Sequence, residues 1–206
     1  EVFHADARAI PLKGESIDLI ITSPPYINVF NYHQNNRPAM ELIGWNLLEI
    51  AKSEIGANRK HRQNRFLTVV QYCLDMLDAL REMKRVLRPD GRAIIVIGRE
   101  STVRSLPFKN GRIVAAIAIG SAEFRLEARQ ERKFKNKFGE IIYEDILHLI
   151  PEPCNVSVDN EVAIQIAQQS LLAASKNTPY EQVASEALEA IRVAYSVQKS
   201  PLFKLV

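Results

Sequence analysis

The chain of 206 residues lacks the features that mark several classes of protein. Its two cysteines, Cys73 and Cys154, are too few for a disulfide framework and do not have the spacing of a zinc site. No stretch approaches the roughly 20 consecutive apolar residues of a membrane-spanning helix, and the first residues do not resemble a signal peptide. We therefore expect a cytoplasmic protein without a membrane partner.

Motifs for metal and phosphate chemistry are missing as well. The four histidines have no HxxxH pattern and no cysteine partner, so no metal ligands are expected. No phosphate-binding P-loop is present, and no two of the eight glycines lie two positions apart. Apolar residues make up 47% of the chain, which is enough for the core of an ordinary domain.

The net charge of +3 conceals an uneven distribution. Residues 151–191 carry six acids and one base, whereas residues 125–137 carry six bases and two acids. A second basic run lies at residues 59–65. Basic runs attract polyanions through counterion release, although a solvated loop has the same composition. The candidate nucleic-acid contacts in the two basic runs are Arg59, Lys60, Arg62, Arg65, Lys133 and Lys135.

The hydrophobic pattern predicts an α/β fold. Residues 16–22 and 92–98 are apolar runs typical of strands buried on both faces, and residues 66–87 between them have the spacing of an amphipathic helix. Strand, helix and strand in this order form a βαβ unit with parallel strands. Further expected elements are a short strand at residues 2–5, a helix with Met40, Ile43, Leu47 and Ile50 on one face, a helix at 111–120, strands at 124–134 and 143–150 forming a late antiparallel hairpin, and helices after 159.

One segment has a pattern that indicates chemistry. Ser23, Pro24, Pro25 and Tyr26 directly follow the predicted strand, and consecutive prolines must end its hydrogen-bonded ladder. The corner would therefore lie at the carboxyl edge of the sheet, where open α/β folds bind ligands. A hydroxyl and free carbonyls accept the hydrogens of an exocyclic amine, and the Tyr26 ring can stack on a planar base. The alternative is that the corner merely starts a loop.

The residues Thr22-Ser23-Pro24-Pro25-Tyr26 resemble the (S/D/N)PPY signature of the amino-group methyltransferases that use S-adenosylmethionine. The serine form is most similar to the cytosine-N4 DNA enzymes, because adenine-N6 enzymes more often have Asp there. Residues 2–8, 83–98 and 143–147 resemble other parts of the family fold. The resemblance covers residues 2–150 and implies a Rossmann-like methyltransferase sheet with a late antiparallel hairpin.

The resemblance also implies roles for individual residues. Ser23 and the carbonyl oxygen of Pro24 would hold the target amine, Pro25 would fix the loop, and Tyr26 would stack on a base flipped out of double-stranded DNA. Asp6 would lie beside the adenosine of S-adenosylmethionine. The candidates for the base pocket are Asn28 and Tyr32. Residues 38–65 would form a target-recognition insertion or flap, and residues 151–206 a helical appendage outside the domain of residues 1–150.

One departure from the family pattern leaves several functions open. The family's cofactor loop contains a G-x-G pair, FxGxG, and this chain has none, so we expect the sheet to lack its cofactor-side strands. In the favoured interpretation, the chain is the catalytic half of a DNA methyltransferase, and a preceding segment or a separate chain carries the cofactor half. An RNA guanine-N2 or protein-glutamine methyltransferase is a second interpretation, although those enzymes usually have Asn or Asp before Pro-Pro. A non-catalytic nucleic-acid-binding or assembly module is the third.

Overall fold

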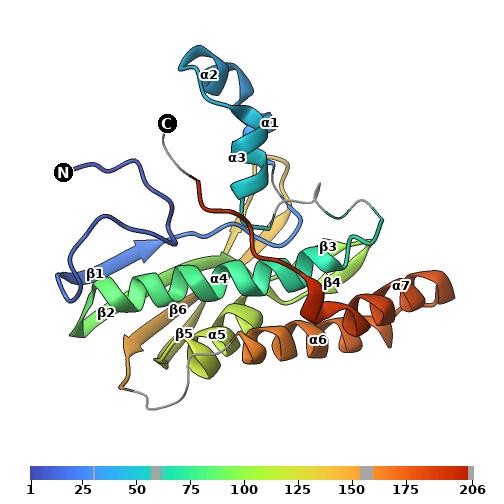
Figure 1. Cartoon of the computed structure of the whole chain (residues 1–206). Coiled ribbons are helices and arrows are strands. Elements are labelled where there is room, and N and C mark those ends of the chain that lie inside the picture. The colour runs from blue at the N-terminus through green and yellow to red at the C-terminus, as the bar shows by residue number, and fades with distance from the viewer. Residues whose placement is uncertain (30, 57–60, 62, 154–159, 204–206) are drawn as a thin grey trace.

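The computed structural model describes residues 1–29, 31–56, 61, 63–153 and 160–203 (Figure 1). Its strands are β1 (Ile17–Thr22), β2 (Leu87–Gly98), β3 (Ser101–Val103), β4 (Leu106–Phe108), β5 (Phe124–Lys135) and β6 (Ile141–Pro151). Its helices are α1 (Tyr32–Asn35), α2 (Arg37–Leu42), α3 (Leu47–Ser53), α4 (Leu67–Val86), α5 (Asn110–Ser121), α6 (Glu161–Ser175), α7 (Glu181–Arg192) and the short 3-10 helix η1 (Ala194–Ser196).

Four strands form the main sheet in the order β1-β2-β6-β5. Strand β1 pairs with β2 in parallel, and the pairs β2-β6 and β6-β5 are antiparallel. Strands β3 and β4 form a separate small hairpin. The expected α/β class, the β1-α4-β2 unit and the late antiparallel hairpin are thus confirmed, with one parallel pair among the three.

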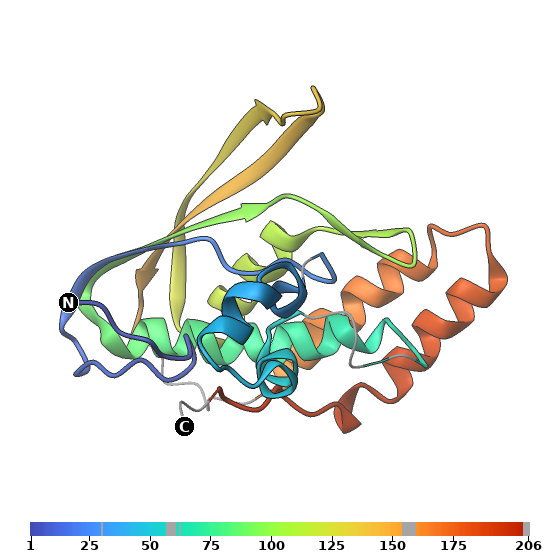
Figure 2. The same cartoon turned by 90° about the horizontal axis from the view of Figure 1, so that it is seen from above.

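Helix α4 crosses one face of the sheet and is the centre of the core (Figures 1 and 2). Its residues Val70, Leu74, Leu77 and Leu80 are buried at the three-to-four spacing expected of an amphipathic helix. The helix ends at Val86 because Leu87 turns to an extended conformation and begins β2. Helices α5 and α6 complete this layer.

The two faces of the sheet differ in burial, which corrects the expectation that both central strands are buried on both faces. On the helix side, Ile95, Ile97 and Leu147 are fully buried. On the other side, Leu19 is 49% and Ile21 is 67% exposed. The reason is that β1 is an edge strand and that, within the described residues, no helix covers this face.

Two other local expectations were wrong. Residues 2–5 form no strand and belong to an extended N-terminal segment. The helix expected around Met40 and Ile50 is divided into α2 and α3, because Gly44 between them adopts a left-handed φ of +75° that no helix can continue through.

The C-terminal helices pack on the helix layer. Ala163, Ala167 and Leu171 of α6 are fully buried in the same core as α4 and α5. The segment after η1 then returns to the N-terminal segment, where the Phe203 N–H donates a hydrogen bond to Asp6 and Arg8 donates one to the Ser200 carbonyl. Among the described residues, no helix is long and apolar enough to cross a membrane.

Candidate active site

The Ser-Pro-Pro-Tyr corner lies where β1 ends, at the carboxyl edge of the sheet. Ser23 is exposed, Pro24 is buried, and Pro25 and Tyr26 are half-buried. The hydroxyl of Tyr72, a fully buried residue of α4, donates a hydrogen bond of 3.1 Å to the carbonyl oxygen of Pro25. No described part of the chain donates a hydrogen bond to the Pro24 carbonyl. The corner is therefore anchored by the Pro25 carbonyl, whereas the adjacent Pro24 carbonyl accepts no hydrogen bond from the described chain.

Tyr26 lies against the end of the neighbouring strand. A Cβ atom added to Gly98 would be 2.6 Å from Cε2 of the Tyr26 ring, so this contact requires glycine. The fully buried Asn110 at the start of α5 donates a 3.1 Å hydrogen bond to the Gly98 carbonyl, and Ser101 donates one of 3.1 Å to Asn110. These bonds fix the surface on which Tyr26 packs.

Asn28 and Tyr32 lie in the same region as the corner. Asn28 has a φ of +59°, and its side-chain amide donates a 3.0 Å bond to the Thr102 carbonyl, which ties the corner's loop to β3. Its Oδ1 is buried without a hydrogen-bond partner among the described residues. An unpaired buried acceptor is costly, so this atom requires a partner from outside the described residues.

Three tyrosines gather at this site. Burial raises the pKa of Tyr32, and the nearby hydroxyl of Tyr26 raises it further. Burial raises the pKa of Tyr72 as well, followed by smaller contributions from Cys73, Tyr26 and Tyr32. The hydroxyls of Tyr32 and Tyr72 are therefore neutral donors at physiological pH.

A hydrogen-bonded histidine and glutamate beside Tyr32 were not expected from the sequence. The almost buried His33 ring lies 2.8 Å from a Glu54 carboxylate oxygen, and the His33 backbone N–H donates a 2.6 Å bond to the other oxygen. The pair joins α1 to the residue that follows α3 and thereby holds Tyr32 near the corner.

The supporting residues Tyr72, Gly98 and Asn110 were also missed by sequence reasoning. A tyrosine on the otherwise apolar face of α4 was a usable signal, since a buried hydroxyl requires a partner. Nothing in the sequence pointed to Pro25 as that partner, 47 positions away.

Asp6 has hydrogen-bond partners within the chain. One carboxylate oxygen accepts bonds from the Arg8 backbone and side chain, and the other from Arg8 and the Phe203 backbone. Burial tends to raise the pKa of Asp6, but these hydrogen bonds lower it to below its ordinary value. Arg8 also reaches Asp75 and the carbonyls of Ser200 and Pro201. The cofactor role of Asp6 stays a prediction.

The predicted nucleic-acid contacts are dispersed. Arg59, Lys60 and Arg62 lie outside the described residues. Arg65 is exposed just before α4, and Lys133 and Lys135 are exposed on β5.

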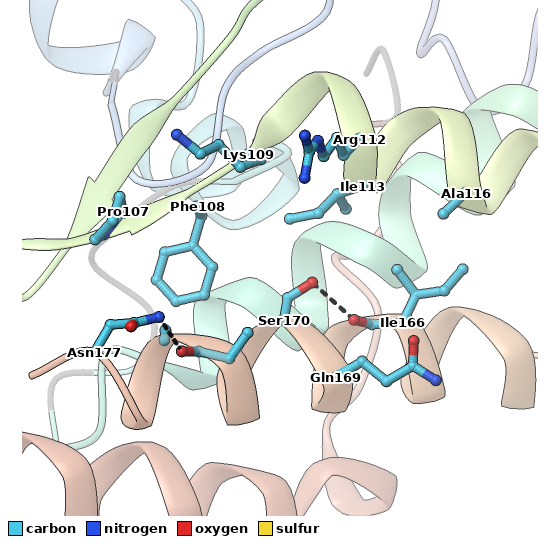
Figure 3. Close-up of a pocket in the computed structure, with 12 residues that line it drawn as sticks. Pro107, Phe108, Lys109, Arg112, Ile113, Ala116, Ile166, Gln169, Ser170 and Asn177 are labelled. Carbon is cyan, nitrogen blue, oxygen red and sulfur yellow. Dashed lines mark hydrogen bonds between the residues drawn. The ribbon is translucent and has the colours of Figure 1, made fainter.

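Two cavities lie near α5. One, of about 490 Å³, is bounded by Phe108, Ile113 and Ile166 between α5 and α6, with Lys109 and Arg112 along its rim (Figure 3). The other, of about 480 Å³, is polar and adjoins the root of the β5-β6 hairpin. Its lining residues are Arg99, Lys109, Arg112, Arg129, Gln130, Glu131 and Asp145. With four bases and two acids, the lining of this second cavity is cationic.

The fold and the site together define an α/β protein with a diproline corner at the edge of its sheet. Residues 17–202 match the model of the DNA methylase family (N6_N4_Mtase), and the chain belongs to this family.

The individual proteins that resemble the chain match a smaller part of it than the family model does. The chain is 30% identical over 138 residues to the Type II methyltransferase M.MjaII of Methanocaldococcus jannaschii, which covers 64% of this chain and 23% of that protein. It thus spans about a quarter of that relative's length. Two crystal structures of TTHA0409 from Thermus thermophilus, described as a DNA modification methylase, are 19% and 20% identical. Both matches cover 76% of this chain and 56% of the other, with TM-scores of 0.39 and 0.41.

Proposed function

We propose that the chain is the catalytic and target-binding part of a DNA methyltransferase that transfers a methyl group from S-adenosylmethionine to an exocyclic amine of a base. Cytosine N4 is the favoured target, because serine precedes the two prolines, and adenine N6 is the alternative. The observation that carries the proposal is the anchored corner in a member of the DNA methylase family: Ser23 is exposed at the strand end, and the Pro24 carbonyl has no partner in the described chain.

The chain's residues would act by positioning the amine. Ser23 Oγ and the Pro24 carbonyl accept its two hydrogens, which directs the nitrogen lone pair away from the corner. Tyr26 stacks on the base while Gly98 supports the other side of its ring. Asn28 and Tyr32 would line the rest of the base pocket. An amine on an aromatic ring is a weak nucleophile, so orientation supplies much of the rate.

The described residues do not by themselves fit the methyl donor. No glycine pair allows a close backbone approach, and both oxygens of Asp6 already have partners. We therefore infer that a segment outside this chain holds S-adenosylmethionine. Support comes from β1, because no described strand pairs with its outer edge and its side chains Leu19 and Ile21 are exposed. A further sheet segment packed there would complete the site beside the corner.

Substitutions in the corner test the proposal. With the cofactor segment supplied, we expect Ser23→Ala to slow single-turnover methyl transfer about tenfold, the value of one hydrogen bond. Tyr26→Ala is expected to slow it about 100-fold through loss of alignment. Duplex affinity should change little. Ser185→Ala and Tyr180→Ala, both at exposed positions on or beside α7, are the matched controls. Wild-type rates in both corner variants would contradict the proposed roles.

A binding experiment separates the split-site interpretation from the alternatives. Calorimetry with this chain alone is expected to give little S-adenosylmethionine binding. Micromolar affinity would show that the chain holds the donor itself. Labelled methyl transfer to duplex DNA, RNA and protein, measured with the cofactor segment present, identifies the substrate class. Failure with all three would favour the non-catalytic module.

A further inference from the structure

The β5-β6 hairpin continues past the end of the main sheet, and we name residues 132–144 the arm (Figure 2). Strand β2 stops pairing with β6 at Gly98, opposite Glu144, and one more bond joins the Arg99 N–H to the Tyr143 carbonyl. Beyond this point β5 and β6 pair only with each other, ending at Lys135 opposite Ile141. Three residue pairs at about 3.4 Å each carry the arm about 10 Å past the sheet, before its turn.

The arm leaves the sheet at the edge that holds the active site. Strands β1 and β2 are parallel, so both end at this edge, and the Tyr26 ring lies on Gly98. Gly98 in turn pairs with Glu144 at the root of the arm. A molecule positioned at the corner therefore has the arm beside it.

The tip of the arm is held in one conformation. The Asn136 side chain accepts bonds from the backbone N–H groups of Phe138 and Glu140, of 2.9 and 3.0 Å. Backbone bonds between Asn136 and both Gly139 and Glu140 close the turn, and Gly139 has a φ of +82°. Phe138 is nevertheless 76% exposed. The turn is thus ordered around an aromatic ring that packs on no core.

The surface of the arm combines aromatic rings with cations. Lys137 lies 5.0 Å above the Phe138 ring, and Arg132 lies 4.9 Å above the Phe134 ring. Arg132 also pairs with Glu144. By contrast, Lys133, Lys135 and Lys137 have no carboxylate partner within the described residues.

The cationic cavity extends this charge toward the corner. Its arginines Arg99 and Arg129 flank the buried Asp145, whereas Arg112 has no ion pair in the described part of the chain. Basic residues therefore occur from Lys137 at the tip of the arm to Arg99, which follows Gly98, and two of them, Arg99 and Arg132, pair with glutamates. The exposed ring of Phe138 and the lysines without carboxylate partners match the stacked bases and the phosphates of a nucleic acid.

We infer that the arm binds duplex DNA beside the extruded base. Phe138 stacks on a base next to the vacated position, and Lys133 and Lys135 contact phosphates. This inference rests on the proposed function and adds to it the element that stabilises the opened duplex. A stacked side chain offsets part of the cost of unstacking the target.

A tryptophan at the tip reports stacking without knowledge of the target sequence. The double variant Trp45→Phe/Phe138→Trp has a single tryptophan, and we expect duplex DNA to quench its emission. Phe138→Ala is expected to weaken duplex binding about tenfold. Phe3→Ala, at another exposed phenylalanine, is the matched control and should leave affinity unchanged.

The salt dependence of binding tests the lysines. Lys133→Gln/Lys135→Gln should lower the slope of log K against log salt by about 2, because two phosphate contacts are lost. Lys13→Gln/Lys176→Gln removes the same charge from exposed positions away from the arm and should leave the slope unchanged.

Each outcome supports or overturns a defined statement. Unchanged tryptophan emission at saturating duplex, together with wild-type affinity in Phe138→Ala, would contradict DNA binding by the arm. The roles of the corner residues would then still be tested separately by methyl transfer. Equal quenching by poly-glutamate or by anionic vesicles would overturn DNA as the partner of the arm. If the wild-type chain bound no DNA, the arm and the proposed function would both fail.

Discussion

The two faces of the main sheet differ in how deeply their apolar side chains are buried. On the face covered by α4 and α5, Ile95, Ile97 and Leu147 are completely removed from solvent. On the opposite face the edge strand presents Leu19 and Ile21, each about half or more exposed. The same type of apolar β-branched sequence supplies both sets of side chains.

The buried side chains of the covered face stabilise the chain itself. The exposed side chains of the other face remain free to pack against another segment. Tyr72 and Asn110, which support the corner, belong to α4 and α5 on the covered side. The bare face carries none of these contacts. We attribute its apolar side chains to packing against the segment that would hold the methyl donor.

The largest expected effect compares isoleucines on the two faces. Ile97→Ala should lower the free energy of unfolding by about 2–5 kcal/mol, because it leaves a cavity in a closed core. Ile21→Ala should change it by less than about 0.5 kcal/mol, as expected for an exposed site. Urea unfolding of both variants provides the measurement. Equal losses would show that the bare face is part of the chain's own core.

A smaller effect is expected beneath the corner. Tyr72→Phe removes the hydrogen bond to the Pro25 carbonyl and should cost about 1 kcal/mol of unfolding free energy. Methyl transfer should slow more than duplex binding weakens, because the corner loses its anchor. Tyr195→Phe, at an exposed residue of η1 outside the arm and the corner, is the control for loss of a hydroxyl. A wild-type rate of methyl transfer in Tyr72→Phe would show that the hydrogen bond to Pro25 does not contribute to the reaction.

The acid stability of the chain should depend in part on Asp6. Its pKa is lowered in the folded chain, so its contribution to stability is present above its ordinary pKa of 3.8 and disappears as pH falls through the folded value. The difference in stability between wild type and Asp6→Asn should therefore narrow below about pH 4. A difference independent of pH would contradict the ionised state of Asp6. Thermal unfolding between pH 3 and 7 measures it.

The smallest effect concerns chemical labelling on the covered side. Burial raises the pKa of the Cys73 thiol well above its ordinary value, so the reactive thiolate is scarce. We expect peptide mass mapping to show alkylation of Cys73 only when the chain unfolds. Rapid labelling of the native chain would indicate that the layer around α4 opens readily.

Much of the framework was predictable because its signals are local. The periodicity of residues 66–87 predicted α4, and two prolines after an apolar run predicted that a strand ends at the corner. The apolar patterns of residues 124–134 and 143–150 correctly predicted the late hairpin.

The rest depends on contacts between distant residues. An apolar strand sequence cannot reveal whether one or two layers cover it, so the exposure of Leu19 and Ile21 was missed. The left-handed φ of Gly44 that divides α2 from α3, and the partner of Tyr72, are likewise set by tertiary structure. The positions of Ser23 to Tyr26 were foreseen, but their supports were not.

Arg8 has a consequence for how the chain assembles. Its guanidinium bonds to carbonyls 192 and 193 positions away, while also pairing with Asp75. Closing so large a loop carries a high entropic cost that is recovered only after the intervening elements have docked. We therefore expect the cluster around this arginine to form late in folding, and its hydrogen-exchange protection would report that the whole polypeptide has reached its final arrangement.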